Sequence, residues 1–203
     1  MSQADTVVIL DFETTGLSPD KGDRAIEIGA VRIENGEITG RFQELMNPGC
    51  RVDSFIEEYT GITNAMLANA PSCAEVMERF ADFIGDDNLV AHNANFDQRF
   101  LDAELSRISR QYSGRFACSL LLARRVCQAA PDHKLGTLVR YLNVSSEGNF
   151  HRALFDSEMT VKIWLAMLDK ITASYGIDPV PFELIKKIMK TPKSSVNGLL
   201  QDW

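Results

Sequence analysis

The chain has 203 residues, of which 45% are hydrophobic and 24% are charged. This balance excludes a disordered or fibrous chain, and the length predicts one globular domain with room for an appendage. The net charge of −7 argues against a protein that coats nucleic acid or anionic membranes through bulk charge, but it does not exclude an enzyme that uses bound metal ions.

The N-terminal part of the chain predicts three strands. Residues 7–11 form an apolar, β-branched run, which is typical of a buried strand. Residues 25–34 alternate in polarity, and the dipeptide at 35–36 is Asn-Gly, which favours a tight turn. Residues 38–46 then form the returning strand. A hairpin is therefore expected beside the first strand.

The middle of the chain predicts a strand between helices. Ser72 and Glu75 form a capping box that opens a helix, and Gly85 is expected to end it. Residues 88–92 read as a second buried strand. Apolar periodicity predicts the later helices, over residues 95–108, 119–127, 135–142 and 152–171. This order predicts an α/β domain in which a mixed central sheet is flanked by helices.

The pattern changes after residue 172. Residues 175–181 are rich in helix breakers, and residues 182–190 can form one amphipathic helix. We predict a main domain over residues 1–172 and a C-terminal helical appendage over residues 173–203. The appendage is either a helix docked on the domain or a segment that binds a partner or substrate.

Membrane and secretion signals are weak. The apolar run at residues 7–10 is too short for a signal peptide or a membrane span. The four cysteines form no C-x-x-C pair. We therefore expect free thiols in a reducing cytoplasm, and no membrane partner.

Acidic residues follow the predicted strands. Asp11 and Glu13 are two residues apart at a strand end, so their side chains point to the same side. Two adjacent carboxylates repel each other unless a cation lies between them, and their oxygens suit Mg²⁺ or Mn²⁺. Asp97 lies early in a predicted helix, and Asp156 lies in another helix just after His151.

These motifs together resemble one enzyme family. The chain contains D-x-E at Asp11 and Glu13, N-x-x-F-D at residues 93–97, and H-x-x-x-x-D from His151 to Asp156. Their order and spacing resemble the DEDDh (DnaQ-like) 3′–5′ exonucleases, a family that includes ribonuclease T and the proofreading subunit of bacterial replicative polymerases. The resemblance covers about residues 7–170 and implies a ribonuclease H-like fold.

The resemblance also implies a mechanism with two divalent cations, Mg²⁺ or Mn²⁺. Asp11, Glu13 and Asp156 would bind the first ion, and Asp11 would also contact the second. Asp97 would hold the site from its helix, directly or through water, and His151 would be the general base. Such an enzyme hydrolyses a phosphodiester by in-line displacement and releases nucleoside 5′-monophosphates.

The resemblance implies substrate contacts as well. A Thr/Gly turn after a strand can hold a phosphate or a terminal sugar through N–H and hydroxyl groups. Phe96 is either a base-stacking residue or a core residue, and His92 is either a substrate contact or a structural residue at a strand end. The predicted substrate-binding residues are Thr14, Thr15, Gly16, Leu17, His92 and Phe96.

A basic segment lies between residues 107 and 125, which contain five arginines and no acid. These arginines could guide a single strand to the site, or they could form a solvated face on two helices. Both interpretations stay open at this point.

We therefore predict a metal-dependent 3′–5′ exonuclease that prefers single-stranded DNA 3′ ends, with a DNA polymerase as a candidate partner. One alternative is an exoribonuclease that trims RNA, because no motif here reports contacts to the 2′-hydroxyl. Another is a non-catalytic module that binds a polymerase or a DNA end. The presence of all five motif residues argues against that module.

Overall fold

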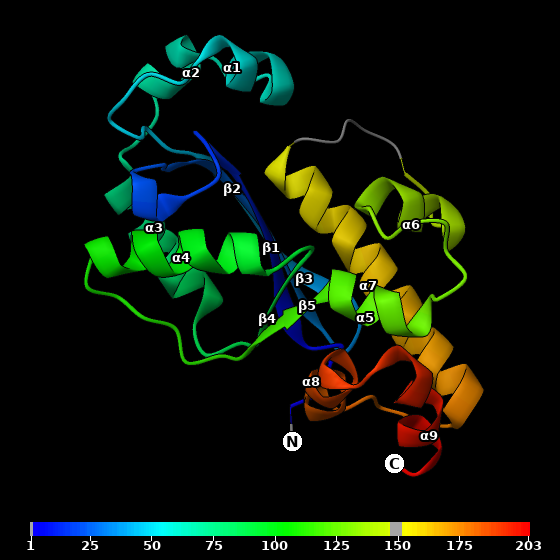
Figure 1. The fold of residues 1–203 in the computed structure, drawn as a ribbon. Helices are drawn as coiled ribbons and strands as arrows, with labels where there is room; N and C mark the ends of the chain where they lie inside the picture. Colours follow the sequence, from blue (N-terminus) through cyan, green and yellow to red (C-terminus); the bar gives the residue numbers. More distant parts are fainter. Residues whose placement is uncertain (1, 147–151) are drawn as a thin grey trace.

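The computed structural model of the protein describes residues 2–146 and 152–203, in which a five-stranded sheet is flanked by helices (Figure 1). The strand order is β3-β2-β1-β4-β5. β1 and β3 are antiparallel to β2, whereas β4 is parallel to β1 and β5 is parallel to β4. The strands are β1 (Val7–Thr14), β2 (Ala25–Glu34), β3 (Glu37–Leu45), β4 (Leu89–Ala91) and β5 (Phe116–Cys118).

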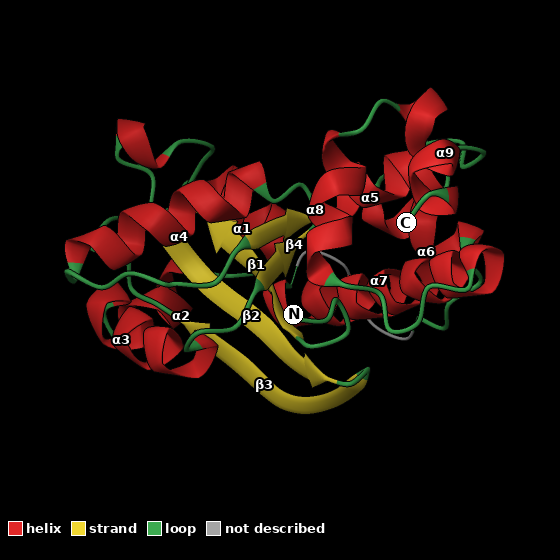
Figure 2. Ribbon diagram, turned by 90° about the horizontal axis from the view of Figure 1, so that it is seen from below, coloured by secondary structure: helices red, strands yellow, loops and turns green. Residues whose placement is uncertain are grey.

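The helices lie on both sides of this sheet (Figures 1 and 2). α7 packs across β1 and β2 on one side, whereas α3 and α4 lie on the other. The helices are α1 (Ser54–Thr60), α2 (Asn64–Ala68), α3 (Cys73–Ile84), α4 (Asn95–Arg107), α5 (Ser119–Val126), α6 (Leu135–Tyr141), α7 (Ala153–Tyr175), α8 (Phe182–Lys190) and α9 (Val196–Gln201). Two short 3₁₀ turns are η1 (Pro19–Lys21) and η2 (Lys193–Ser195).

β1 is the central strand, and its two faces differ in chemistry. Phe12 points toward α3, where its ring centroid lies 6.4 Å from that of Phe80. Side chains alternate along a strand, so Asp11 and Glu13 point to the opposite face, which α7 covers. The hydrophobic core thus ends at a pair of carboxylates.

The predicted mixed α/β architecture is confirmed, and so is the capping box that opens α3, where the Glu75 carboxylate accepts the Ser72 N–H at 2.9 Å. Four elements are absent from the predicted order: β5, α1, α2 and α9. β5 has three residues and α1, α2 and α9 have seven or fewer, so each displays little periodic pattern. The equally short β4 and α6 were predicted, because apolar residues extend over 88–92 and 135–142. Local signals for α1 exist, because Asp53 caps its first turn and Gly61 ends it at φ 71°.

The C-terminal segment packs against the rest of the chain. Phe182, Ile185 and Ile188 of α8 are fully buried in the main hydrophobic core. The N-terminus ties this segment down, because the Ala4 N–H donates to the Val180 carbonyl at 2.9 Å. α7 continues to Tyr175, three residues past the predicted boundary at residue 172. This arrangement corresponds to the docked-helix interpretation.

Candidate active site

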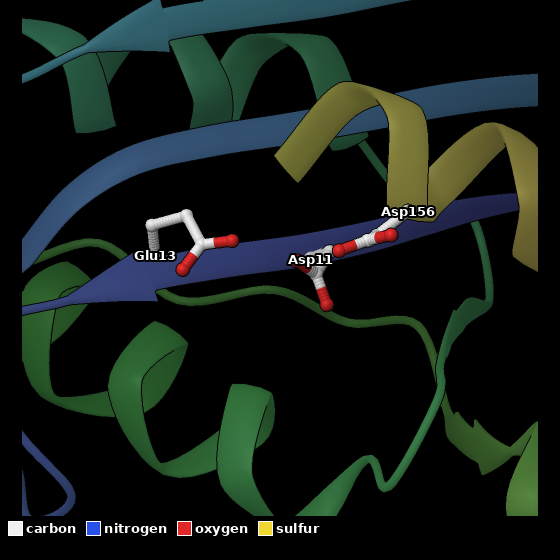
Figure 3. Close-up of side chains that lie close together, drawn as sticks. All are labelled: Asp11, Glu13 and Asp156. Carbon is white, nitrogen blue, oxygen red and sulfur yellow. The ribbon is translucent and has the colours of Figure 1, made fainter. Parts of the chain in front are cut away.

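Three carboxylates meet where β1 passes beneath the first turn of α7. Asp11 and Glu13 come from β1 and Asp156 comes from α7, and one oxygen of each lies within 4.8 Å of the others. In Figure 3 the Asp11 and Asp156 side chains point toward one another, and Glu13 lies farther along the strand. Glu13 and Asp156 are each only 9% exposed. Such a group of buried anions has the composition of a site for hard divalent cations.

A close approach of helix and strand brings Asp156 to this position. Gly29 of β2 lies directly under α7, where a Cβ atom would come within 2.0 Å of the Leu154 backbone nitrogen. The Ser157 hydroxyl donates to the Gly29 carbonyl at 2.9 Å. Only a residue without a side chain allows this contact, so the glycine sets how deeply α7 sits on the sheet.

Asp97 reaches the same region from the first turn of α4. It is 2% exposed, and its Oδ1 accepts the backbone N–H of Phe12 at 3.1 Å. It therefore holds the strand between Asp11 and Glu13 but is not one of the three clustered ligands. His151 lies outside the described residues.

Burial and mutual repulsion raise the pKa values of the carboxylates in the site. Burial, followed by the charge of Asp156, raises the pKa of Glu13 to about 8. Burial also raises the pKa of Asp97 to about 8, against the opposing effect of the Phe12 hydrogen bond. Burial and the neighbouring Asp97 raise the pKa of Asp11 well above its usual range. Without a cation these groups therefore hold protons at pH values where an ordinary carboxyl is ionised.

A pocket of about 660 Å³ adjoins the carboxylates. Its walls come from the β1 strand end, the loop after it, α1, α4 and α7. The lining residues are Asp11, Phe12, Glu13, Thr14, Thr15, Gly16, Leu17, Asp53, Phe55, Ile56, Tyr59, Thr60, Phe96 and Asp156. The structure thus brings the predicted residues 14–17 and Phe96 to the carboxylates.

Two aromatic residues of the pocket were missed by the sequence reasoning. Phe55 and Tyr59 of α1 stack at a centroid distance of 5.9 Å and an interplanar angle of 14°. They are 67% and 51% exposed, and Leu17, which also lines the pocket, is 77% exposed. Large apolar side chains exposed together at a pocket indicate a binding surface. In the sequence, the i, i+4 spacing of Phe55 and Tyr59 indicates that the two rings lie on one face of a helix.

The loop after β1 uses most of its own polar groups internally. The Thr14 hydroxyl donates to the Gly16 carbonyl at 2.6 Å, and the Thr15 hydroxyl accepts the Arg24 N–H at 3.0 Å. The Thr15 N–H donates to the Arg24 carbonyl at 2.9 Å. The Asp23 carboxylate fills the space beside Gly16, where a Cβ atom would meet it at 2.5 Å. These hydroxyls therefore shape the loop instead of pointing freely toward a ligand.

His92 has protein partners at both ring nitrogens. Its Nε2 lies 3.0 Å from the His133 carbonyl, and its Nδ1 lies 2.8 Å from the Ser119 hydroxyl. Burial lowers the pKa of His92 to about 4, so the ring is neutral, with Nε2–H donating and Nδ1 accepting. This geometry favours the structural interpretation of His92 over a substrate contact.

Two of the five arginines between residues 107 and 125 pair with acids from other elements. Arg110 pairs with Glu78 at 2.8 Å and with Asp82 at 2.6 Å. Arg115 pairs with Glu183 of α8. At Arg110 and Arg115 the positive charge is therefore paired, which agrees with the solvated-face interpretation for these two residues.

Fold and site together define a class of protein: a ribonuclease H-like domain with an acidic centre for phosphodiester chemistry. A family model described as "Exonuclease" matches residues 8–164, and the chain belongs to this exonuclease family. The predictions of a DEDDh-type exonuclease and of a ribonuclease H-like fold are confirmed at the level of the family.

Individual relatives agree with this assignment. The chain is 34% identical over 177 residues to DNA polymerase III subunit epsilon of Aquifex aeolicus, covering 85% of each protein. It is 36% identical over 200 residues to a PolC-type DNA polymerase III of Caldanaerobacter subterraneus subsp. tengcongensis, and it spans only 14% of that relative. Exonuclease X, solved with 5′ overhanging duplex DNA, is 28% identical with a TM-score of 0.66, over 90% of this chain and 98% of that one.

Within residues 2–146 and 152–203, no helix combines the length and hydropathy needed to cross a bilayer.

Proposed function

We propose that this chain hydrolyses nucleic acid from the 3′ end, releases nucleoside 5′-monophosphates and prefers single-stranded DNA. The observation that carries this proposal is the position of three carboxylates, within 4.8 Å of one another, at the wall of an open apolar pocket. The pocket offers apolar contact to a base, while the carboxylates lie where a phosphodiester can reach them. Such a site fits the end of an unpaired strand.

The carboxylates fit two divalent cations, Mg²⁺ or Mn²⁺. Asp11, Glu13 and Asp156 would hold the first ion, and Asp11 would also contact the second. The raised pKa of Glu13, about 8, supports this assignment, because burial and the nearby charge of Asp156 disfavour an ionised carboxylate that no cation neutralises. When bound, such cations offset the charge of the phosphodiester and lower the pKa of the attacking water.

The chain's own residues then carry out three tasks. Asp97 holds the Phe12 N–H and so fixes the strand that carries Asp11 and Glu13. His151 takes the proton of the attacking water, because a neutral imidazole with a pKa near 6.5 is an effective base at pH 7. Gly29 lets α7 approach the sheet closely, so that Asp156 reaches Asp11 and Glu13.

The pocket would hold the terminal nucleotides. Leu17 and Phe96 line it, and so do Phe55 and Tyr59 of α1. Stacking on an aromatic ring suits every base and contributes about 1–3 kcal/mol per base. The pocket therefore favours flexible, unpaired ends and does not select a particular base sequence.

We also propose the setting in which this site works. Residues 1–172 would form the catalytic domain, and residues 173–203 would form a docked C-terminal extension of it. A DNA polymerase is the proposed partner, because a relative of similar length is named a DNA polymerase III subunit. The four free cysteines support a reducing cytoplasm.

The direct test is cleavage of matched DNA and RNA oligonucleotides with Mg²⁺, Mn²⁺ or EDTA. A 5′ label should produce a ladder that shortens from the 3′ end, and EDTA should stop it. Failure to cleave with either metal would overturn the proposal, and binding without cleavage would identify a non-catalytic module. If RNA is degraded faster than DNA, RNA becomes the preferred substrate and the proposed preference for DNA is wrong.

A further inference from the structure

Glu27 of β2 is a buried carboxylate beside the active site. Its side chain is fully buried, and in the β1–β2 pairing it lies directly opposite Glu13. A charged group in this position requires strong partners, because the loss of hydration is costly. The identity of those partners shows what Glu27 holds in place.

Among the residues that the structure describes, the hydrogen bonds to Glu27 come from two directions, the start of α7 and strand β3. The Arg152 guanidinium donates to both oxygens, at 2.7 Å through Nη2 and at 3.2 Å through Nε. The backbone N–H of Ala153, the first residue of α7, donates to Oε2 at 3.1 Å. Gln43 of the neighbouring strand donates to Oε1 at 2.9 Å and holds the carboxylate itself.

Glu27 thereby fixes the beginning of α7. It satisfies an N–H at the helix N-terminus, where a negative charge also interacts favourably with the helix dipole. Its bidentate bond with Arg152 is directional, so it sets both the position and the rotation of the first helical turn. Asp156, in that same turn, is the ligand that must reach Asp11 and Glu13.

We propose that Glu27 is a positioning residue that aligns Asp156 with the other two carboxylates and so maintains the affinity of the site for divalent cations. This inference depends on the proposed function only in that the site holds cations. Packing at Gly29 sets the depth of α7, whereas the bonds of Glu27 set its position along the strand. A merely stabilising ion pair would affect unfolding but not cation affinity.

The test uses the full chain and measures Mn²⁺ binding by calorimetry, together with kcat and KM on a single-stranded oligonucleotide. Glu27→Gln should weaken Mn²⁺ binding by about 10–100-fold, as expected for loss of an outer partner of a metal ligand. At saturating Mn²⁺, kcat should fall while KM stays within about twofold, since the nucleotide pocket is not changed.

A second variant separates geometry from charge. Arg152→Lys keeps both charges but loses the bidentate fork, and its half-exposed position allows folding even where Glu27→Gln fails. It should weaken Mn²⁺ binding by at least about threefold. Glu158→Gln is the matched control, because Glu158 also joins α7 to the sheet, through Arg41 at 2.8 Å, but on the exposed surface.

Three results decide the outcome. Weaker Mn²⁺ binding in both variants, with unchanged binding in Glu158→Gln, supports the positioning role. Unchanged binding in folded Arg152→Lys overturns it, even where Glu27→Gln weakens binding, because the loss of charge alone would then explain the effect. A wild-type protein that binds Mn²⁺ but cuts no substrate would refute the proposed function and leave this comparison intact.

Discussion

Arg24, just before β2, and Glu104, in α4, form a bidentate ion pair between Nε and Oε1 at 2.8 Å and between Nη2 and Oε2 at 2.9 Å. Glu104 is 2% exposed, and it also accepts the Ala25 N–H at 3.3 Å. The pair joins α4, which carries Asp97, to the loop that lines the pocket beside the carboxylates. It connects two parts of the site that are 80 residues apart in sequence.

Glu104→Gln should therefore destabilise the fold. Breaking one partner of a buried pair leaves the other charge unpaired and costs about 3 kcal/mol at the lower end of the usual range, because Arg24 is partly exposed. For a domain of this length we expect the Tm to fall by about 6–12 °C. Glu78→Gln, in the exposed pair with Arg110, should change the Tm far less. Equal Tm shifts in both variants would contradict this prediction.

Asp11→Ala should abolish nuclease turnover while the protein stays folded. The variant removes a ligand from the carboxylate cluster but also removes repulsion among like charges, so the metal-free protein should be at least as stable as the wild type. Oligonucleotide cleavage and thermal unfolding measure the two effects. Asp169→Ala, at an exposed position of α7, should retain activity. Activity in Asp11→Ala would remove this residue from the mechanism.

The metal-free protein should lose stability as the pH rises from about 4.5 to 8. The pKa of Glu13 is about 8 in the folded protein but near 4.5 in an unfolded chain, so the folded state binds more protons in this range. The contribution of Glu13 to the free energy of unfolding is complete below pH 4.5 and is lost as the pH rises through 8. Asp97 should add to the same trend.

Urea unfolding in EDTA at several pH values measures this loss. Adding Mg²⁺ should restore stability at pH 8, because the cation binds the ionised carboxylates. Glu13→Gln should flatten the pH profile. A stability that rises with pH across this window in EDTA would contradict the assignment.

Phe55→Ala should weaken substrate binding with little effect on the chemical step. The loss of one stacking surface, about 1–3 kcal/mol, corresponds to a rise in KM of about 5–150-fold. Tyr141→Ala is the matched control, because Tyr141 is an exposed aromatic residue outside this pocket. An unchanged KM for Phe55→Ala would exclude Phe55 from substrate binding.

The two histidines of the motifs should respond differently. His151→Ala should lower kcat by about 10²–10⁴-fold if His151 is the general base. His92→Ala should lower the Tm, because it removes both buried hydrogen bonds of the ring, while kcat per folded molecule stays near the wild-type value. A rise in KM for His92→Ala at unchanged stability would restore the substrate-contact interpretation.

Local patterns in the sequence were enough to predict much of this protein. Strand and helix periodicities depend on neighbouring residues, so they predicted β1, β2, β3 and the long helices. The spacing of Asp11, Glu13, Asp97, His151 and Asp156 predicted the family. The short elements β5, α1, α2 and α9 escaped because their stability comes from tertiary packing instead of their own pattern.

Only the tertiary structure decided how these residues meet. It brought Asp156 to Asp11 and Glu13 through the contact at Gly29 and placed Asp97 beside Asp11, with its Oδ1 on the Phe12 N–H. It paired Arg110 and Arg115 with acids from distant elements and placed α1 over the pocket. Sequence alone identifies which side chains carry charge or rings, but pairing and burial depend on contacts between segments far apart in the chain, and those contacts set each group's partners and pKa.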